Sequence, residues 1–165
     1  MKFRNLGIAA ALMVAASCSM QAQVKVTRDY ATPKARFATS IWAGDTLYVA
    51  GQMASPVTPE DKAKGTPAVY GDTEAQATSV FKKLDEILKA QGLTLADIVQ
   101  MDIFCAPDPN KGNKMDFDGV NAAYAKFFGT ADQPARPVRA AVQVAGLATP
   151  WGLVEIQVVA VKPAK

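Results

Sequence analysis

Histidine is absent from this chain of 165 residues, and cysteine occurs only at Cys18 and Cys105. The lack of histidine excludes Ser-His-Asp and Cys-His catalysis, histidine-ligated zinc and the histidine-pair mechanism of many ribonucleases. Two isolated cysteines form neither a CxxC pair nor a thiolate cluster, so a structural zinc site is excluded as well. GxGxxG and P-loop motifs are also missing. The chemistry that remains uses arginine for anion binding, carboxylates for proton transfer and backbone groups for orientation.

Acidic residues are missing from the first 23 positions, which have the layout of a secretory signal peptide. Lys2 and Arg4 precede an apolar run that ends at Ala16, and small or polar residues follow it. The run is too short to span a membrane as a stable helix, so we expect residues 1–23 to be removed on export to the periplasm. The triplet Ala-Ala-Ser before Cys18 loosely resembles a lipoprotein box, which leaves acylation of Cys18 as the less favoured alternative.

The rest of the chain divides into an N-terminal extension at residues 24–34 and one domain at residues 35–165. Half of all residues are hydrophobic, which is enough for a single core at this length. Removal of residues 1–23 takes away two of the 18 basic residues and none of the 15 acidic ones, which leaves a net charge of 18 − 2 − 15 = +1. That charge does not indicate a nucleic-acid or anionic-membrane partner.

The apolar periodicity predicts an α+β domain, with one mixed sheet and two helices on one face. The order is β-β-α-β-α-β-β, and the two helices are bounded by capping residues and by glycines. The predicted ranges are strands at 37–42, 46–50, 98–105, 138–145 and 153–161, and helices at 72–92 and 116–128.

Both faces of the last strand carry apolar side chains. Val159 and Val161 lie on the opposite parity to Val154, Ile156 and Val158. Two helices can cover only one face of the sheet, so the second apolar face predicts self-association.

Arg139 opens the strand at 138–145 and shares one face with Ala141, while Val142 and Val144 share the other face, which we assign to the core. Small neighbours leave room around the guanidinium, whose permanently charged planar fork fits a carboxylate. The alternative is an arginine at a strand end that forms a surface ion pair.

The stretch Pro-x-Arg-x-x-Val-x-Val-x-x-Leu around Arg139, together with the strand that follows, resembles the end of the RidA (YjgF) family of enamine/imine deaminases. Ala50-Gly51-Gln52 resembles the Ser-Gly-Gln that ends a strand in that family. The segments 76–92 and 116–128 resemble its two helices, and the resemblance covers about residues 35 to 162.

This resemblance implies the chorismate-mutase-like RidA fold and a homotrimer with clefts between neighbouring subunits. It also implies hydrolysis of 2-imino and 2-enamino acids to 2-oxo acids and ammonia, without metal or organic cofactor. The alternative function is a non-catalytic module that binds a small carboxylate in the same pocket. RNA cleavage is sometimes attached to the family, but the absence of histidine and the near-neutral charge argue against it here.

The resemblance assigns Arg139 to the substrate carboxylate and Glu155 to proton transfer. Gly51 and Gln52 match the backbone segment that lines the pocket, and Asn121 matches the helix asparagine near it. Partial burial of Glu155 would raise the pKa of its carboxyl, which suits proton exchange near neutral pH. Glu155 on the wet face of an edge strand is the alternative.

Four positions depart from the family pattern. Phe37 stands where the deaminases have a tyrosine, Ala50 where they have a serine, Ala140 where they have serine or threonine, and Ala141 at the common cysteine position. The pocket lining, to which Phe37 and Ala141 belong, is therefore less polar than the family pattern.

A hairpin of the last two strands, with Gly146 opposite Gly152, would place Arg139 opposite Val159. Glu155 would then lie on the same face about 13 Å away by strand rise, too far to share one small acid. Either the register differs or the site is completed across a subunit interface, and we favour the interface.

Overall fold

The computed structural model describes residues 23–164. Cys18 and all but the last residue of the predicted signal peptide lie outside this range. In chain order the elements are β1 (Val26–Asp29), β2 (Ser40–Ala43), β3 (Thr46–Met53), α1 (Thr73–Ala90), the 3-10 turn η1 (Leu95–Asp97), β4 (Ile98–Cys105), the 3-10 turn η2 (Pro109–Lys111), α2 (Phe117–Tyr124), β5 (Val138–Gln143) and β6 (Val154–Val161).

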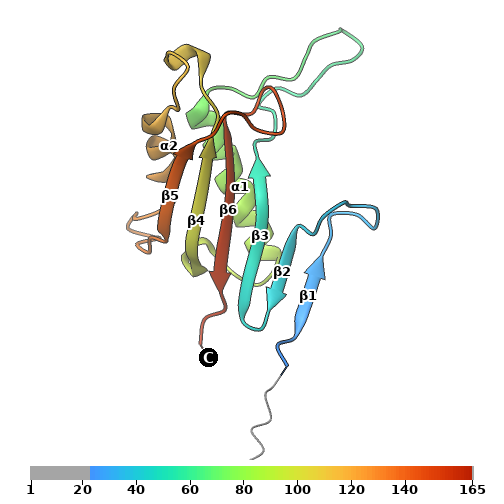
Figure 1. Cartoon of the computed structure of the whole chain (residues 1–165), viewed down its shortest axis with the longest axis vertical. Helices are drawn as coiled ribbons and strands as arrows, with labels where there is room; N and C mark the ends of the chain where they lie inside the picture. The colour runs from blue at the N-terminus through green and yellow to red at the C-terminus, as the bar shows by residue number, and fades with distance from the viewer. Residues whose placement is uncertain (1–22, 165) are drawn as a thin grey trace, which may run out of the picture.

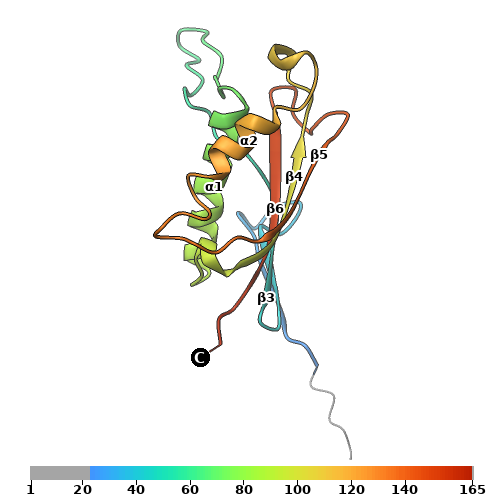
Figure 2. The same ribbon diagram turned by 90° about the vertical axis from the view of Figure 1, so that its left-hand side faces the viewer.

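The six strands form one mixed sheet in the order β1-β2-β3-β6-β4-β5 (Figure 1). Neighbours are antiparallel except β4 and β5, which are parallel. Both helices pack on the same side of the sheet, as the edge-on view in Figure 2 shows, which confirms the predicted layering. The face away from the helices is called the open face here. No helix within residues 23–164 is long and apolar enough to cross a membrane.

Helix α1 forms as its sequence predicts. The side chain of Asp72 accepts a hydrogen bond from the backbone N–H of Ala75 (2.9 Å) and caps the N-terminus. Gly92, with φ +75°, follows the C-cap, a conformation that costs glycine little. The apolar stripe that includes Phe81 and Leu84 is fully buried against the sheet.

Helix α2 is shorter than the predicted range of 116–128. It ends at Tyr124, and the next turn is tightened by backbone hydrogen bonds from Lys126 to Ala123 and from Phe127 to Tyr124, which span three residues instead of four. The chain then buries Phe128, 2% exposed, and reverses at Gly129, which has φ +71°.

Three sequence predictions about the strands are wrong or incomplete. β5 and β6 do not form a hairpin, because β4 lies between them and pairs with both. Val142 does not face the core and is 47% exposed. Val26–Asp29, placed in an N-terminal extension, pairs with β2 as an edge strand of the sheet.

Candidate functional site

Arg139 lies on the helix side of the sheet, between the edge strand β5 and helix α2. Its register partner is Met101 in β4, whose side chain is fully buried on that side. The guanidinium Nη2 donates a hydrogen bond to Oδ1 of Asn121 in α2 (2.9 Å). The structure thus brings together two residues that were predicted to share a site.

Two aromatic rings from α2 complete the surroundings of the guanidinium. Its Cζ lies 4.7 Å from the ring centroid of Tyr124 and 5.7 Å from that of Phe117, both within the range of cation–π attraction. Neither ring was among the predicted site residues. The spacing carried the signal, because positions 117, 121 and 124 lie on one face of a helix.

The charge of Arg139 is not neutralised by a carboxylate. None of the ion pairs within residues 23–164 includes Arg139, so the predicted alternative of a surface ion pair is not what the structure has. Its second terminal nitrogen, Nη1, is buried and has no hydrogen-bond partner. A buried, unpaired charged donor is costly and points to an absent acceptor.

Cys105, at the end of β4, lies near this charge. Its side chain is fully buried, and burial raises the pKa of the thiol to about 11, although the positive charge of Arg139 acts in the opposite direction. The negative charge of Asp116 adds to the upward shift. Cys105 is therefore a packed neutral thiol and not a nucleophile at neutral pH.

Glu155 and Gly51 form the second group of predicted residues. Glu155 alternates with the buried Val154 and Ile156 in β6 and therefore faces the open side of the sheet. Its carboxylate lies so close to Gly51 that any side chain at position 51 would collide with it. Gly51 sits in a bulge of β3, where Ala50 and Gly51 together interrupt the pairing with β6.

The remaining predicted site residues, Gln52, Ala141 and Phe37, lie in different parts of the fold. The amide Nε2 of Gln52 folds back onto the carbonyl oxygen of Ala50 (2.9 Å), which stabilises the bulge. Ala141 is half-buried, two residues beyond Arg139 on the same face. Phe37 is 70% exposed and lies before β2, near the edge of the sheet that is opposite β5. The structure therefore does not bring Phe37 to Arg139.

Within one chain, Arg139 and Glu155 are held apart. Two strand spacings separate β5 from β6, and the register places Glu155 three residues farther along β4 than Arg139. Strand geometry puts their Cα atoms about 14 Å apart. The two side chains also point to opposite faces of the sheet, whereas the supposed hairpin would have placed them on one face.

Comparison with known proteins agrees with this fold. The family model described as Endoribonuclease L-PSP matches residues 27–162. A RutC family protein of Pyrococcus horikoshii is 31% identical over 85% of this chain and 98% of its own length. TdcF of Escherichia coli, named as a proposed reactive intermediate deaminase, is 33% identical over 73% of this chain and 82% of its own.

Solved structures show the same architecture. A member of the YjgF protein family from Neisseria meningitidis superposes with a TM-score of 0.63 at 19% identity, and the match covers 87% of this chain and all of that one. A crystal structure of Escherichia coli TdcF with bound serine superposes with a TM-score of 0.59 at 29% identity, over 77% of this chain and 88% of that one. The chain therefore belongs to the Endoribonuclease L-PSP family, the RidA (YjgF) family that its motifs resemble.

Proposed function

We propose that the protein hydrolyses 2-imino and 2-enamino acids to 2-oxo acids and ammonia, and that Arg139 binds the substrate carboxylate. The observation that carries the proposal is the state of this guanidinium. Asn121 and the Tyr124 ring orient it, while no carboxylate of the described chain neutralises it and Nη1 lacks an acceptor. A small carboxylic acid supplies both the charge and the acceptor. Since Nη1 is buried, the Arg139 side chain must shift on binding so that this nitrogen reaches the ligand.

The chemistry needs few other groups. Water adds to the electrophilic C=N carbon and gives a carbinolamine, whose C–N bond then breaks to release ammonia and leave the C=O of the 2-oxo acid. A 2-enamino acid first takes a proton on its β-carbon and loses one from nitrogen, which gives the imine. Both protons of the attacking water end on the nitrogen: one moves there as the water adds, and the other moves from the carbinolamine hydroxyl as the C–N bond breaks. Each step needs a group that relays a proton between oxygen and nitrogen. We assign this transfer to Glu155, whose carboxylate forms no ion pair within residues 23–164 and is held against Gly51.

The proposal requires a second copy of the chain. One small acid cannot touch Arg139 and Glu155 of the same chain, because they lie on opposite faces of the sheet. We therefore propose a homotrimer in which β5 of one copy faces the Gly51–Glu155 region of the next. The exposed Tyr48 and Val161 on the open face support this assembly, because burial of such residues stabilises an interface.

The relatives support the chemical class. TdcF carries a deaminase name and has been solved with serine, a small amino acid with a carboxylate. The signal-like residues 1–23 support a further proposal that the mature protein is exported. Fractionation of cells that express the full chain tests the proposed export. Protein that is found in the cytoplasm with its first 23 residues still attached would contradict it.

The first test uses imines generated in place by an amino-acid oxidase, with 2-oxo acid release followed by semicarbazone formation. We expect acceleration by the wild type and loss of activity in Arg139→Ala, because the bidentate contact contributes about 2–5 kcal/mol. Arg139→Lys should recover little, since a point charge does not replace the fork. Arg136→Ala is the matched control, because Arg136 is exposed and its one side-chain hydrogen bond within residues 23–164 goes to the Gly129 carbonyl oxygen (3.4 Å).

The outcomes separate the alternatives. No acceleration by the wild type, together with thermal stabilisation by 2-oxobutanoate that Arg139→Ala abolishes, would identify a binding module without turnover. Cleavage of a single-stranded RNA substrate that survives Arg139→Ala would favour the activity in the family model's description. A collapse of the melting temperature in Arg139→Ala would make Arg139 structural and overturn the proposal.

A mixing experiment tests the shared site. Arg139→Ala and Glu155→Gln should each be inactive alone. The two variants are dissociated, mixed in equal amounts and reassembled. If each site takes Arg139 from one subunit and Glu155 from the next, a quarter of the randomly formed sites carry both residues. The mixture should then regain about a quarter of the wild-type activity. Activity that stays at the level of the separate variants would refute a shared site.

A further inference from the structure

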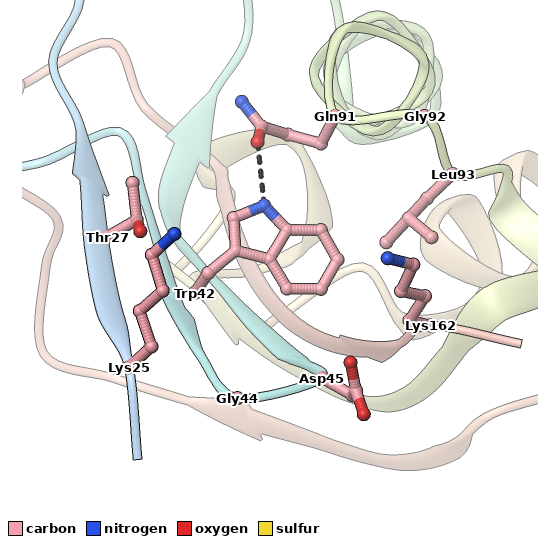
Figure 3. A pocket seen from close by; sticks show the side chains of 9 residues that line it. All are labelled: Lys25, Thr27, Trp42, Gly44, Asp45, Gln91, Gly92, Leu93 and Lys162. Carbon is pink, nitrogen blue, oxygen red and sulfur yellow. Dashed lines mark hydrogen bonds between the residues drawn. The ribbon is translucent and has the colours of Figure 1, made fainter. Parts of the chain in front are cut away.

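A pocket of about 330 Å³ lies at the end of the sheet where the β2–β3 turn, the last turn of α1 and the end of β6 meet (Figure 3). Its lining includes Lys25, Thr27, Trp42, Asp45, Leu93 and Lys162. β1 and β2 provide one wall, on the opposite edge of the sheet from β5 and Arg139. This pocket is therefore separate from the candidate site of the proposed function.

The half-buried indole of Trp42 occupies the centre of the pocket in a fixed orientation. Its Nε1 donates a hydrogen bond to Oε1 of Gln91 (2.8 Å), and Nε2 of Gln91 donates to Oδ2 of Asp29 (3.2 Å). Trp42 pairs with the buried Leu47, so it lies on the helix side of the sheet. Because the indole N–H already has a partner, the ring offers its face to a ligand rather than its donor.

Two ammonium groups stand on either side of this ring. Figure 3 shows Lys25 and Lys162 flanking the indole, with Asp45 at the rim. Neither lysine belongs to an ion pair in the described part of the chain. The lining carries two cations and one carboxylate, a net charge of 2 − 1 = +1. This charge favours a monoanion over a dianion or a cation.

We propose that this pocket binds a planar aromatic monocarboxylate, whose ring stacks on Trp42 and whose carboxylate pairs with one of the two flanking ammonium groups, Lys25 or Lys162, while the other adds to the positive field. A fixed aromatic face with two flanking cations recognises a ring that bears one negative group, and the volume is in the range of small-molecule sites. The pocket lies on the helix side, so a second copy that covers the open face leaves it accessible. The inference does not rest on the proposed deaminase activity.

The test is a titration of the mature protein with indole-3-carboxylate, followed by the ¹H–¹⁵N signal of the Trp42 indole and by calorimetry. Trp151→Phe identifies which of the two indole signals is Trp42 and keeps an aromatic ring against Tyr70. Indole-3-carboxamide is the uncharged control. We expect the carboxylate to shift the Trp42 signal saturably and the carboxamide to bind at least about tenfold more weakly.

Three variants sharpen the test. Lys25→Ala and Lys162→Ala, both at exposed positions, should each weaken binding about two- to fivefold. Asp45→Asn should strengthen it by a similar factor, because it removes the one opposing charge. Arg139→Ala should leave it unchanged. The proposal would be overturned by equal affinity for the carboxamide, or by wild-type affinity in a variant that carries both Lys25→Ala and Lys162→Ala. It would also be overturned by weaker binding to Asp45→Asn, or by loss of the Trp42 shift in Arg139→Ala.

Discussion

Gln76, near the start of α1, joins the helix to the loop before it and to the distant entry of β6, and only 1% of its surface is exposed. Its Nε2 donates to the carbonyl oxygens of Gly71 (3.2 Å) and Trp151 (3.1 Å), and its Oε1 accepts from the N–H of Leu153 (2.9 Å). One amide therefore fixes the end of the long 56–71 loop and the entry to β6 against the helix. Gln76→Met keeps the volume and removes all three bonds.

At about 1 kcal/mol for each bond, the variant should lose about 3 kcal/mol of unfolding free energy. A domain of this size should then melt roughly 10 °C lower. Urea denaturation followed by circular dichroism measures the loss, and the m-value should stay constant. Gln100→Met is the matched control, because Gln100 is exposed and its side chain, among the residues that the structure describes, hydrogen-bonds to Asp102 of the same strand alone. A change below about 0.5 kcal/mol in Gln76→Met, equal to that of an ordinary surface substitution, would refute the reasoning.

Two further predictions concern the two halves of the candidate site. Gly51→Ala should displace the Glu155 carboxylate and lower kcat by about 100-fold or more, with little change in KM. The melting temperature should change little, because the flexible Glu155 side chain can move aside. A wild-type kcat would mean that this carboxylate does not act. Cys105 keeps its proton in the folded state up to a pKa of about 11, while the unfolded thiol ionises near about 8.5, so stability should fall as pH rises between these values. Urea denaturation at pH 8 and pH 10 should show a more negative change of unfolding free energy with pH in the wild type than in Cys105→Ala, and equal changes would contradict the prediction.

The elements that the sequence predicted well carry several agreeing signals. α1 has a capping aspartate, an apolar stripe and a glycine after its last turn, and β4 was predicted with its observed bounds, Ile98–Cys105. The sequence of β1 carries no apolar alternation that would indicate a strand. All four of its residues are exposed, and they pair because the edge of β2 offers unpaired backbone groups. Such a strand leaves no hydrophobic pattern to detect.

The sequence suggested a β5–β6 hairpin only as a supposition, and the structure does not have it. The reason lies in the composition of the two last strands. Val154, Ile156, Val158 and Ala160 of β6 are at most 2% exposed, whereas no residue of β5 is buried. β5 offers arginine, glutamine and alanines, which suit an edge. The central position of β6 between β3 and β4 follows from that contrast.

The same strand order explains why Arg139 meets Asn121 but not Glu155 within one chain. Arg139 and Asn121 meet because a β5 position on the helix side faces α2, a local consequence of parity and helical spacing. Glu155 lies on the other side of a sheet whose core face is filled by α1 and α2, so no rearrangement of side chains within one chain joins it to Arg139. If both groups act on one acid, the edge strand of one copy must meet the open face of the next. Such a contact is heterologous, and rotational closure into a ring satisfies every copy equally. The exposed side chains on the open face and the unneutralised guanidinium at the edge are then two consequences of a single arrangement.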